Sequence, residues 1–297
     1  MKLDLANLTA FAAVLSEGSF DAAAKRLHVT PSAVSQRIKS LESQIGQVLI
    51  QRTRPARPTE AGQVLVRLAG QIALFEGEAL AALGSRRDQV EPSVRLSVAV
   101  NADSLATWFL PVLTHLPERL VTTFDIRRED QDHTAELLRN GTVMAAVTAD
   151  ARAVQGCSVE GLGAMRYLAV ASPGYVRRYL PAGPTPEAMS EAPVLAFDRK
   201  DLLQERFAQL LIGKQLDSPT TYLPSSWGFV EATCLGIAWG MVPQSMAQPQ
   251  LDTGNLVEIA PQLHLDVPLY WQRWRLDSPL LAALTDAVRT AAATSLT

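Results

Sequence analysis

The sequence predicts two unlike modules: an all-α winged helix-turn-helix at the N-terminus, and a two-lobed α/β domain that follows a long linker helix. Three observations predict this fold class. Residues 16–42 have the pattern of two short helices around a tight turn, one long amphipathic helix follows, and strands then alternate with helices. We expect a helix-turn-helix domain over 1–58, a linker helix and hinge over 59–88, and a C-terminal domain over 89–297.

The helix-turn-helix begins with a helix from about Asp21 to Leu27, and a turn at residues 28–30 follows. Thr30 is suited to cap the next helix, and Pro31 fits its first position, where a backbone amide would have no partner. Apolar residues recur in this second helix at the spacing of one buried stripe: Val34, Ile38 and Leu41. The opposite side is small and polar, which suits a helix that enters the major groove of DNA.

The polar side of this second helix supplies candidate DNA contacts. A glutamine can pair with adenine through two hydrogen bonds, and an arginine can reach guanine or a phosphate. The candidates on this helix are Ser32, Ser35, Gln36, Arg37 and Lys39. The competing interpretation is an ordinary solvated amphipathic helix, but the preceding helix, turn and cap fit the docking geometry together.

Charge is distributed unevenly along the chain. The whole chain carries −3, whereas residues 1–90 carry +3 and residues 25–57 alone carry +6. Arg52, Arg54 and Arg57 lie in a proline-interrupted loop after the helix-turn-helix, which suits a wing that follows phosphates or enters a minor groove. Such a loop can also serve solubility alone, but its position favours DNA binding. Double-stranded DNA is therefore a predicted partner.

The segment from Thr59 to about Leu83 contains no proline, and its apolar residues recur at alternating spacings of three and four. This is the spacing of a seam that pairs with another helix. The predicted dimerisation residues are Leu65, Leu68, Ile72 and Phe75. The alternative is a helix that packs on its own domain.

Short β-branched segments alternate with amphipathic helices in the C-terminal domain, which predicts parallel sheets covered on both faces. In the first lobe we expect strands at 95–100, 121–127 and 143–148, and helices at 103–116 and 132–140. In the second lobe we expect strands at 166–171, 194–197, 220–223 and 240–242. A strand at 267–274 and a helix at 278–293 should return to the first lobe, which would comprise about 92–165 and 267–297, with the second lobe at about 166–266.

Ligands of open α/β sheets bind beyond the carboxyl ends of the strands, so the residues that follow each strand are candidate ligand contacts. Ser104 would lie at a helix N-terminus, where its hydroxyl and the free amides can bind a carboxylate. The candidate effector-binding residues are Asn101, Asp103, Ser104, Glu129, Asp130, Thr148, Asp198, Ser226 and Trp227.

Other features exclude several classes of site. The chain has 297 residues, of which 47% are apolar and 19% charged, as in ordinary globular proteins. Its four histidines are scattered, and Cys157 and Cys234 lack metal-ligand spacing, so we predict no catalytic residue, metal or cofactor. No run approaches the roughly 18 apolar residues of a membrane span. We expect a cytoplasmic protein without membrane contact.

Residues 5–62 resemble the DNA-binding domain of LysR-type transcriptional regulators. The matching motifs are Gly18-Ser19-Phe20, Ser32-Ala33-Val34-Ser35-Gln36 and Thr59-Glu60-Ala61-Gly62. The sequence departs from the family at Ile50, where the family usually has Phe, but the residue at this position is still apolar. The resemblance implies a periplasmic-binding-protein-like effector domain and dimerisation through the linker helix, in a dimer or a dimer of dimers that reads two half-sites. RNA polymerase is a further candidate partner.

Four strings are similar to those of the ArgP/LysG branch of this family, which responds to lysine and arginine and controls genes of basic amino-acid export or metabolism. They are NADSLATWFLP (101–111), EDQDHT (129–134), WGMVPQ (239–244) and YWQRWRLDSP (270–279). A basic amino acid needs one anion site and an acid for each cation that it buries. Ser104 would receive the carboxylate of L-lysine or L-arginine, and the cations would be received by Asp103, Glu129, Asp130 and Asp198.

Other functions remain open at this stage. Some members of the branch carry an older description as inhibitors of replication initiation, which would fit a sequence-tolerant DNA-binding protein whose second module only oligomerises. A LysR-type regulator with a different effector is another alternative, and an enzyme with a DNA-binding head is a third. A footprint and a titration with free amino acids separate these classes.

Overall fold

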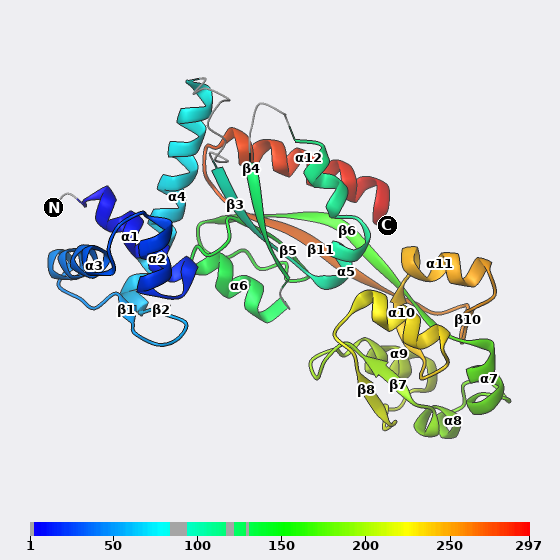
Figure 1. Ribbon diagram of the computed structural model, residues 1–297. Helices are drawn as coiled ribbons and strands as arrows, with labels where there is room; N and C mark the ends of the chain where they lie inside the picture. Colours follow the sequence, from blue (N-terminus) through cyan, green and yellow to red (C-terminus); the bar gives the residue numbers. More distant parts are fainter. Residues whose placement is uncertain (1–2, 84–93, 117–121, 129–130) are drawn as a thin grey trace.

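The computed structural model describes residues 3–83, 94–116, 122–128 and 131–297. They form three parts in a row: a helical head, a central lobe, which we call lobe I, and an outer lobe, lobe II (Figure 1). Helix α4 (Glu60–Ala82) joins the head to lobe I. The predicted hinge, residues 85–88, lies outside the described residues.

Three helices form the head: α1 (Leu5–Glu17), α2 (Phe20–Arg26) and α3 (Pro31–Ile45). Each begins at a side chain that accepts backbone amide hydrogen bonds: Asp4, Ser19 and Thr30, respectively. The predicted apolar stripe of α3 is buried in one core with Phe11 and Val14 of α1. The helix-turn-helix and the capping role of Thr30 are therefore confirmed.

Two short antiparallel strands form the wing, β1 (Ile50–Gln51) and β2 (Arg57–Pro58). Glu42, the only acid among residues 25–57, joins this wing to α3. Its Oε1 accepts hydrogen bonds from the amides of Leu49 at 2.9 Å and Ile50 at 3.4 Å. Its carboxylate therefore ties the first strand of the wing to α3.

Helix α4 begins close against the wing. The Thr59 hydroxyl donates to the carbonyl of Val48 at 2.7 Å and accepts from the amide of Gly62 at 3.1 Å. A Cβ at position 62 would lie 2.2 Å from the carbonyl oxygen of Leu49, so only glycine fits this approach.

The predicted dimerisation seam on α4 is largely occupied within the chain. Leu65 is buried in the core of the head, and Leu68 and Ile72 pack against the same core. Leu65 therefore has intramolecular partners, Leu68 and Ile72 are only partly covered, and the dimerisation role of the four residues stays a prediction. Phe75 remains 42% exposed and Val64 62% exposed.

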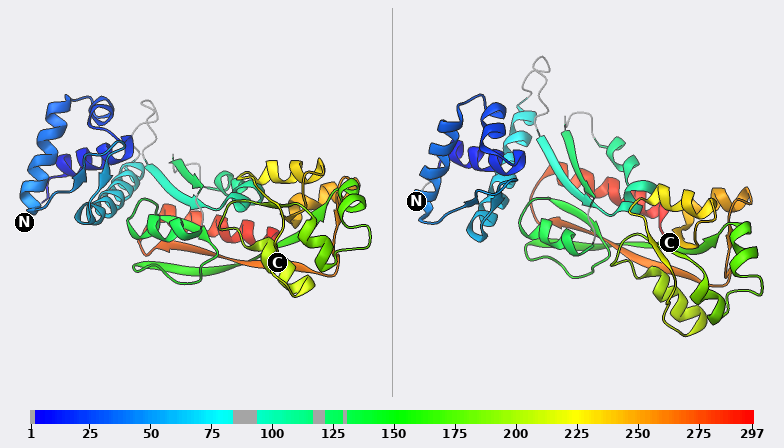
Figure 2. Two further views of the ribbon diagram at one scale, coloured as in Figure 1. Left: turned by 90° about the horizontal axis from the view of Figure 1, so that it is seen from below. Right: turned by 60° about the horizontal axis from the view of Figure 1, so that its bottom comes forward.

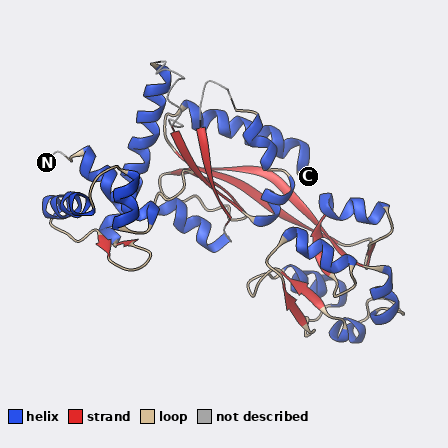
Figure 3. Cartoon of the chain, viewed as in Figure 1, coloured by secondary structure: helices blue, strands red, loops and turns tan. Residues whose placement is uncertain are grey.

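A mixed seven-stranded sheet runs from lobe I into lobe II (Figure 3). Its order is β10-β6-β11-β5-β3-β4, and β9 also pairs with β6. Strand β3 is parallel to β4 and β5, as predicted, but β11 is antiparallel to both β5 and β6. The strands are β3 (Val94–Val100), β4 (Thr122–Arg128), β5 (Ala145–Thr148), β6 (Cys157–Ala171), β9 (Gly240–Pro243), β10 (Val257–Glu258) and β11 (His264–Trp274).

Strands β6 and β11 cross between the lobes as a continuous pair. At the crossing, Arg166 faces Asp266, and the two side chains form a bidentate ion pair with both N–O distances at 2.9 Å. Strand β6 begins at Cys157 rather than at residue 166, where the sequence predicted its start. Gly161 and Gly163 interrupt the alternation of apolar and polar residues, so the first half of the strand was not recognised.

In lobe I, the predicted helix over 103–116 is divided into α5 (Ala102–Thr107) and the 3₁₀-helix η1 (Leu110–Thr114). Pro111 favours the break, because proline lacks the amide hydrogen that a continuous α-helix would need at that position. The lobe also contains α6 (Gln131–Arg139) and α12 (Pro279–Ser295). Helix α12 returns to lobe I and packs on β6 and η1, alongside the sheet in Figure 2.

Lobe II is built around the ends of the crossing strands. Its other elements are α7 (Pro173–Tyr179), α8 (Pro186–Glu191), β7 (Val194–Ala196), α9 (Leu203–Ile212), β8 (Thr220–Tyr222), α10 (Ser226–Cys234) and α11 (Gln244–Asp252). Strands β7 and β8 are parallel, as predicted. No helix in the described ranges is long and apolar enough to span a membrane.

Candidate functional site

The outer face of α3 presents the predicted base contacts. Ser32, Gln36 and Lys39 are exposed, while Ser35 and Arg37 are half-buried. The hydroxyls of Ser32 and Thr30 lie 2.9 Å apart at the start of the helix. The buried stripe on the opposite face fixes the rotation of α3, so Ser32, Gln36 and Lys39 project from one face of the head.

The wing places Arg52, Arg54 and Arg57 on the surface, and all three are exposed. The guanidinium carbon of Arg52 lies 5.2 Å from the ring centroid of Phe20, which orients this arginine beside the start of α2. Exposed cations beside an exposed polar helix give the head the charge and shape of a duplex-binding surface.

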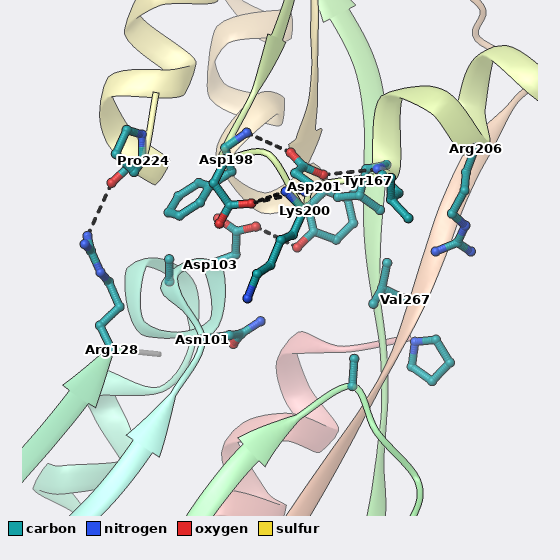
Figure 4. A pocket seen from close by; sticks show the side chains of 16 residues that line it. Asn101, Asp103, Arg128, Tyr167, Asp198, Lys200, Asp201, Arg206, Pro224 and Val267 are labelled. Atoms are coloured by element: carbon teal, nitrogen blue, oxygen red, sulfur yellow. Dashed lines mark hydrogen bonds between the residues drawn. The ribbon is translucent and has the colours of Figure 1, made fainter. Parts of the chain in front are cut away.

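A cavity of about 700 Å³ lies between the two lobes (Figure 4). Asn101, Asp103 and Arg128 line it from lobe I, and a loop and helix α9 line it from lobe II. Figure 4 shows the Lys200 side chain extending toward Asn101. The charged residues in the lining are Asp103, Arg128, Asp198, Lys200, Asp201 and Arg206.

Asp103 links the two lobes at the inner end of this cavity. Its carboxylate accepts a 2.6 Å hydrogen bond from the hydroxyl of Ser226 and a 2.7 Å bond from that of Tyr167. Burial raises the pKa of the Asp103 carboxyl, and the two hydrogen bonds offset part of that shift. Burial and the neighbouring Asp103 raise the pKa of Tyr167 well above its usual value, so Tyr167 serves as a donor.

On the opposite side, backbone amides orient the acids of lobe II. Asp201 accepts hydrogen bonds from the amides of Phe197 at 2.8 Å and Leu203 at 3.0 Å. Asp198 accepts from the amides of Lys200 at 2.7 Å and of Asp201 at 3.1 Å. These bonds hold both carboxylates near the cavity without neutralising their charge.

The basic residues reach the cavity from both lobes. Arg128, at the end of β4, donates to the carbonyl of Pro224 across the cleft at 3.4 Å. Lys200 and Arg206 line the cavity from lobe II. A ligand in this space can therefore meet cations and anions at once, which suits a molecule that carries a carboxylate together with positive groups.

The structure places only part of the predicted effector set at this cavity. Asn101, Asp103 and Asp198 line it, and Ser226 donates to Asp103. Glu129 and Asp130 lie outside the described residues. The remaining predicted residues, Ser104, Thr148 and Trp227, do not contribute to the lining.

Each of these three departures has a local reason. The side chain of Ser104 is fully buried, because Asn101 caps α5 and the next turn faces inward. Thr148 is also buried, and its hydroxyl accepts a hydrogen bond from the amide of Asp150. Trp227 is 67% exposed on the outer surface.

Sequence reasoning missed several lining residues. Asp201 and Lys200 follow the predicted Asp198 closely, so the strand-end rule could have included them. Arg128 is the last residue of β4 and directly precedes the predicted Glu129. Tyr167 and Arg206 lie within a strand and a helix, and only the tertiary fold brings them to the cavity.

Comparisons with known proteins agree with this two-part arrangement. Residues 5–63 match the bacterial regulatory helix-turn-helix protein model of the LysR family, and residues 89–293 match the LysR substrate binding domain. The chain is 51% identical to the HTH-type transcriptional regulator LysG of Mycobacterium tuberculosis, over 98% of this chain and 94% of that protein. It is 43% identical to the lysine export transcriptional regulatory protein LysG of Corynebacterium glutamicum, over 94% of each.

Solved structures give the same result in three dimensions. The crystal structure of ArgP from Mycobacterium tuberculosis is similar with a TM-score of 0.86 and 50% identity, covering 99% of each chain. Full-length LysG from Corynebacterium glutamicum with bound effector Arg is similar with a TM-score of 0.76 and 41% identity, again over 99% of each chain.

Proposed function

Since this chain belongs to the LysR family of bacterial transcriptional regulators, we propose that its interlobe cavity binds a basic amino acid, L-lysine or L-arginine, which controls its action on DNA. The charge of the cavity is the observation that carries this proposal. Asp103, Asp198 and Asp201 can receive two cationic groups, and the basic residues of the lining can receive the α-carboxylate. The arginine bound to the Corynebacterium glutamicum relative supports the same ligand class.

The proposed assignment of charges places the α-carboxylate near Arg128 and Lys200, in place of the role first expected for Ser104. The cationic groups would lie toward Asp103 and the lobe II acids. Regulation of genes for basic amino-acid export or metabolism is the corresponding role, since the relatives include a lysine export regulator.

The DNA partner is proposed to meet the outer face of α3 in its major groove and the wing arginines along its backbone. Two copies would join through exposed positions of α4 such as Phe75, as a dimer or dimer of dimers that presents paired heads. We assign the protein no catalytic step, and RNA polymerase is a further proposed partner. A regulator of chromosomal DNA would act in the cytoplasm.

A thermal-shift screen against free amino acids tests the effector proposal. L-lysine or L-arginine should raise the melting temperature, because a ligand that binds only the folded state stabilises it. L-leucine, which has no distal cation, should leave the melting temperature unchanged. Equal stabilisation by leucine would remove the proposed ligand class and leave a LysR-family regulator with a different effector.

A further inference from the structure

We propose that Arg67 transmits the state of the interlobe cavity to the DNA-binding head. The inference rests on the ligand-controlled function proposed above. Arg67 is on α4, outside the DNA-binding face and outside the cavity lining. Its side chain contacts two elements of lobe I, β11 and α6.

The first of these contacts is with β11. The guanidinium carbon of Arg67 lies 4.7 Å from the ring centroid of Trp274, the last residue of that strand. Trp274 is 5% exposed, and a Cβ at Gly156 would lie 2.6 Å from its ring on another side, so the indole has little room to move. Val267 and Pro268, on the same strand, line the cavity.

The second contact is with the C-terminal end of α6. Arg67 donates a hydrogen bond to the carbonyl of Arg139, the last residue of that helix. A Cβ at Gly141 would lie 2.5 Å from the Cα of Arg67, so the two backbones touch just beyond the helix. Helix α6 begins three residues after Arg128, which lines the cavity.

The remaining contacts hold α4 at both ends. Toward the head, Leu65 is buried in the head core. Toward lobe I, Leu74 is buried in the lobe I core, and Glu78 accepts hydrogen bonds from the hydroxyl of Ser278 and the amide of Leu280 at the start of α12. A shift of lobe I relative to the head would therefore act on the contacts of α4.

Arg67 is suited to this role because its contacts depend on direction. Leu74 packs through apolar contacts, which tolerate small sliding. A hydrogen bond, by contrast, weakens steeply when its angle changes. The Nε of Arg67 is buried and has no hydrogen-bond partner in the described part of the chain, so the side chain depends on the ring and the carbonyl. When α6 and β11 move together, the guanidinium can follow both; when they separate, it must lose one.

The test compares Arg67→Met with Arg178→Met in the full-length chain. Methionine keeps the apolar stem and removes the guanidinium in both variants. Arg178 is a matched control in lobe II, exposed and 4.9 Å from the ring centroid of Tyr179. Two quantities are measured for each protein: the Kd for L-arginine by calorimetry, and the Kd for DNA from upstream of its own reading frame, with and without saturating L-arginine.

The ratio of the two DNA dissociation constants is the coupling factor, for which about 5–150-fold is typical of allosteric proteins. We expect wild-type and Arg178→Met proteins to share one coupling factor. Arg67→Met should bring that factor close to one, while its Kd for L-arginine and its DNA affinity without L-arginine stay within about twofold of wild type. A residue with only a structural role would lower stability without removing the coupling.

An unchanged coupling factor in Arg67→Met would overturn the inference and leave the proposed effector intact. A wild-type protein that binds no L-arginine or L-lysine would overturn both, because no ligand signal would then exist to transmit. If Arg67→Met fails to fold, Arg67→Lys provides the same reading. The lysine ammonium lacks the planar guanidinium, which can stack on the Trp274 ring and donate a hydrogen bond at the same time. A reduced coupling factor is therefore expected, and a wild-type factor would overturn the inference.

Discussion

The hydroxyl of Ser226, at the start of α10 in lobe II, donates a 2.6 Å hydrogen bond to the carboxylate of Asp103 on α5 in lobe I. Asp103 also accepts from Tyr167 on the crossing strand β6. One buried acid of lobe I is thus bonded to lobe II and to the crossing strand at the inner end of the charged cavity. Its charge is available to a cationic ligand, and its hydrogen bonds depend on the relative position of the lobes.

Replacement of Asp103 should weaken ligand binding. Asp103→Asn removes the charge that faces a bound cation, and hydrogen bonds to charged groups contribute about 1.5–3 kcal/mol. We expect the Kd for L-arginine to rise by about tenfold or more, measured by calorimetry. An unchanged Kd would show that Asp103 does not contact the ligand.

The same variant should gain relative stability as the pH rises. Burial raises the pKa of Asp103 in the folded state above the ordinary aspartate value of 3.8. Its contribution to the free energy of unfolding is therefore full below that value and is lost as the pH rises through the raised pKa. The melting temperature of Asp103→Asn minus that of the wild type should be larger at about pH 7 than at about pH 4. The opposite trend would show that the carboxylate is stabilised in the fold.

Ser104→Ala should preserve the Kd for L-arginine and should not lower stability. The Ser104 hydroxyl is buried and has no hydrogen-bond partner among the residues that the structure describes. An unsatisfied buried polar group costs about 1–3 kcal/mol, so its removal should raise the free energy of unfolding in urea titrations. A large loss of L-arginine affinity would restore Ser104 as a ligand contact.

On DNA, two substitutions should have different effects. Gln36→Ala should remove base-edge contacts worth roughly 1–3 kcal/mol and relax sequence specificity. Arg52→Ala should weaken binding to all sequences alike and reduce the dependence of binding on salt. Competition assays with specific and random duplexes at several salt concentrations distinguish the two. Equal loss of both kinds of binding in Gln36→Ala would contradict the placement of α3 in the major groove.

For self-association, Phe75→Glu should dissociate the proposed dimer. Phe75 is exposed in the single chain, so a charge there is tolerated by the monomer but is costly in an apolar interface. Light scattering should show a halved mass with a retained fold by circular dichroism. Leu65→Glu is the contrasting variant, since this buried position should unfold the head instead. A wild-type mass for Phe75→Glu would place the interface elsewhere.

The head could be predicted in detail because its signals are local. Thr30, Pro31 and the apolar stripe of α3 each act within a few residues of chain. The cavity could be predicted only in part. The strand-end rule located Asn101, Asp103 and Asp198, but whether a side chain faces a cleft depends on tertiary packing, which turned Ser104 inward.

The crossing strands and α4 show the same limit. Antiparallel pairing of β6 with β11 depends on residues about one hundred positions apart, which no local pattern encodes. The heptad spacing of α4 correctly predicted an apolar face, but spacing does not say whether that face meets the same chain or another. Leu65 shows that part of it meets its own head.

Calorimetric titration with L-arginine and L-citrulline tests the central claim most directly. Citrulline has nearly the shape of arginine, including its α-carboxylate and α-ammonium, but its distal group is uncharged. The distal guanidinium would be paired with the acids of the cavity, so we predict saturable binding of L-arginine and at least tenfold weaker binding of L-citrulline, about 1.4 kcal/mol or more. Equal affinities for the two ligands would contradict a cavity built for a basic amino acid.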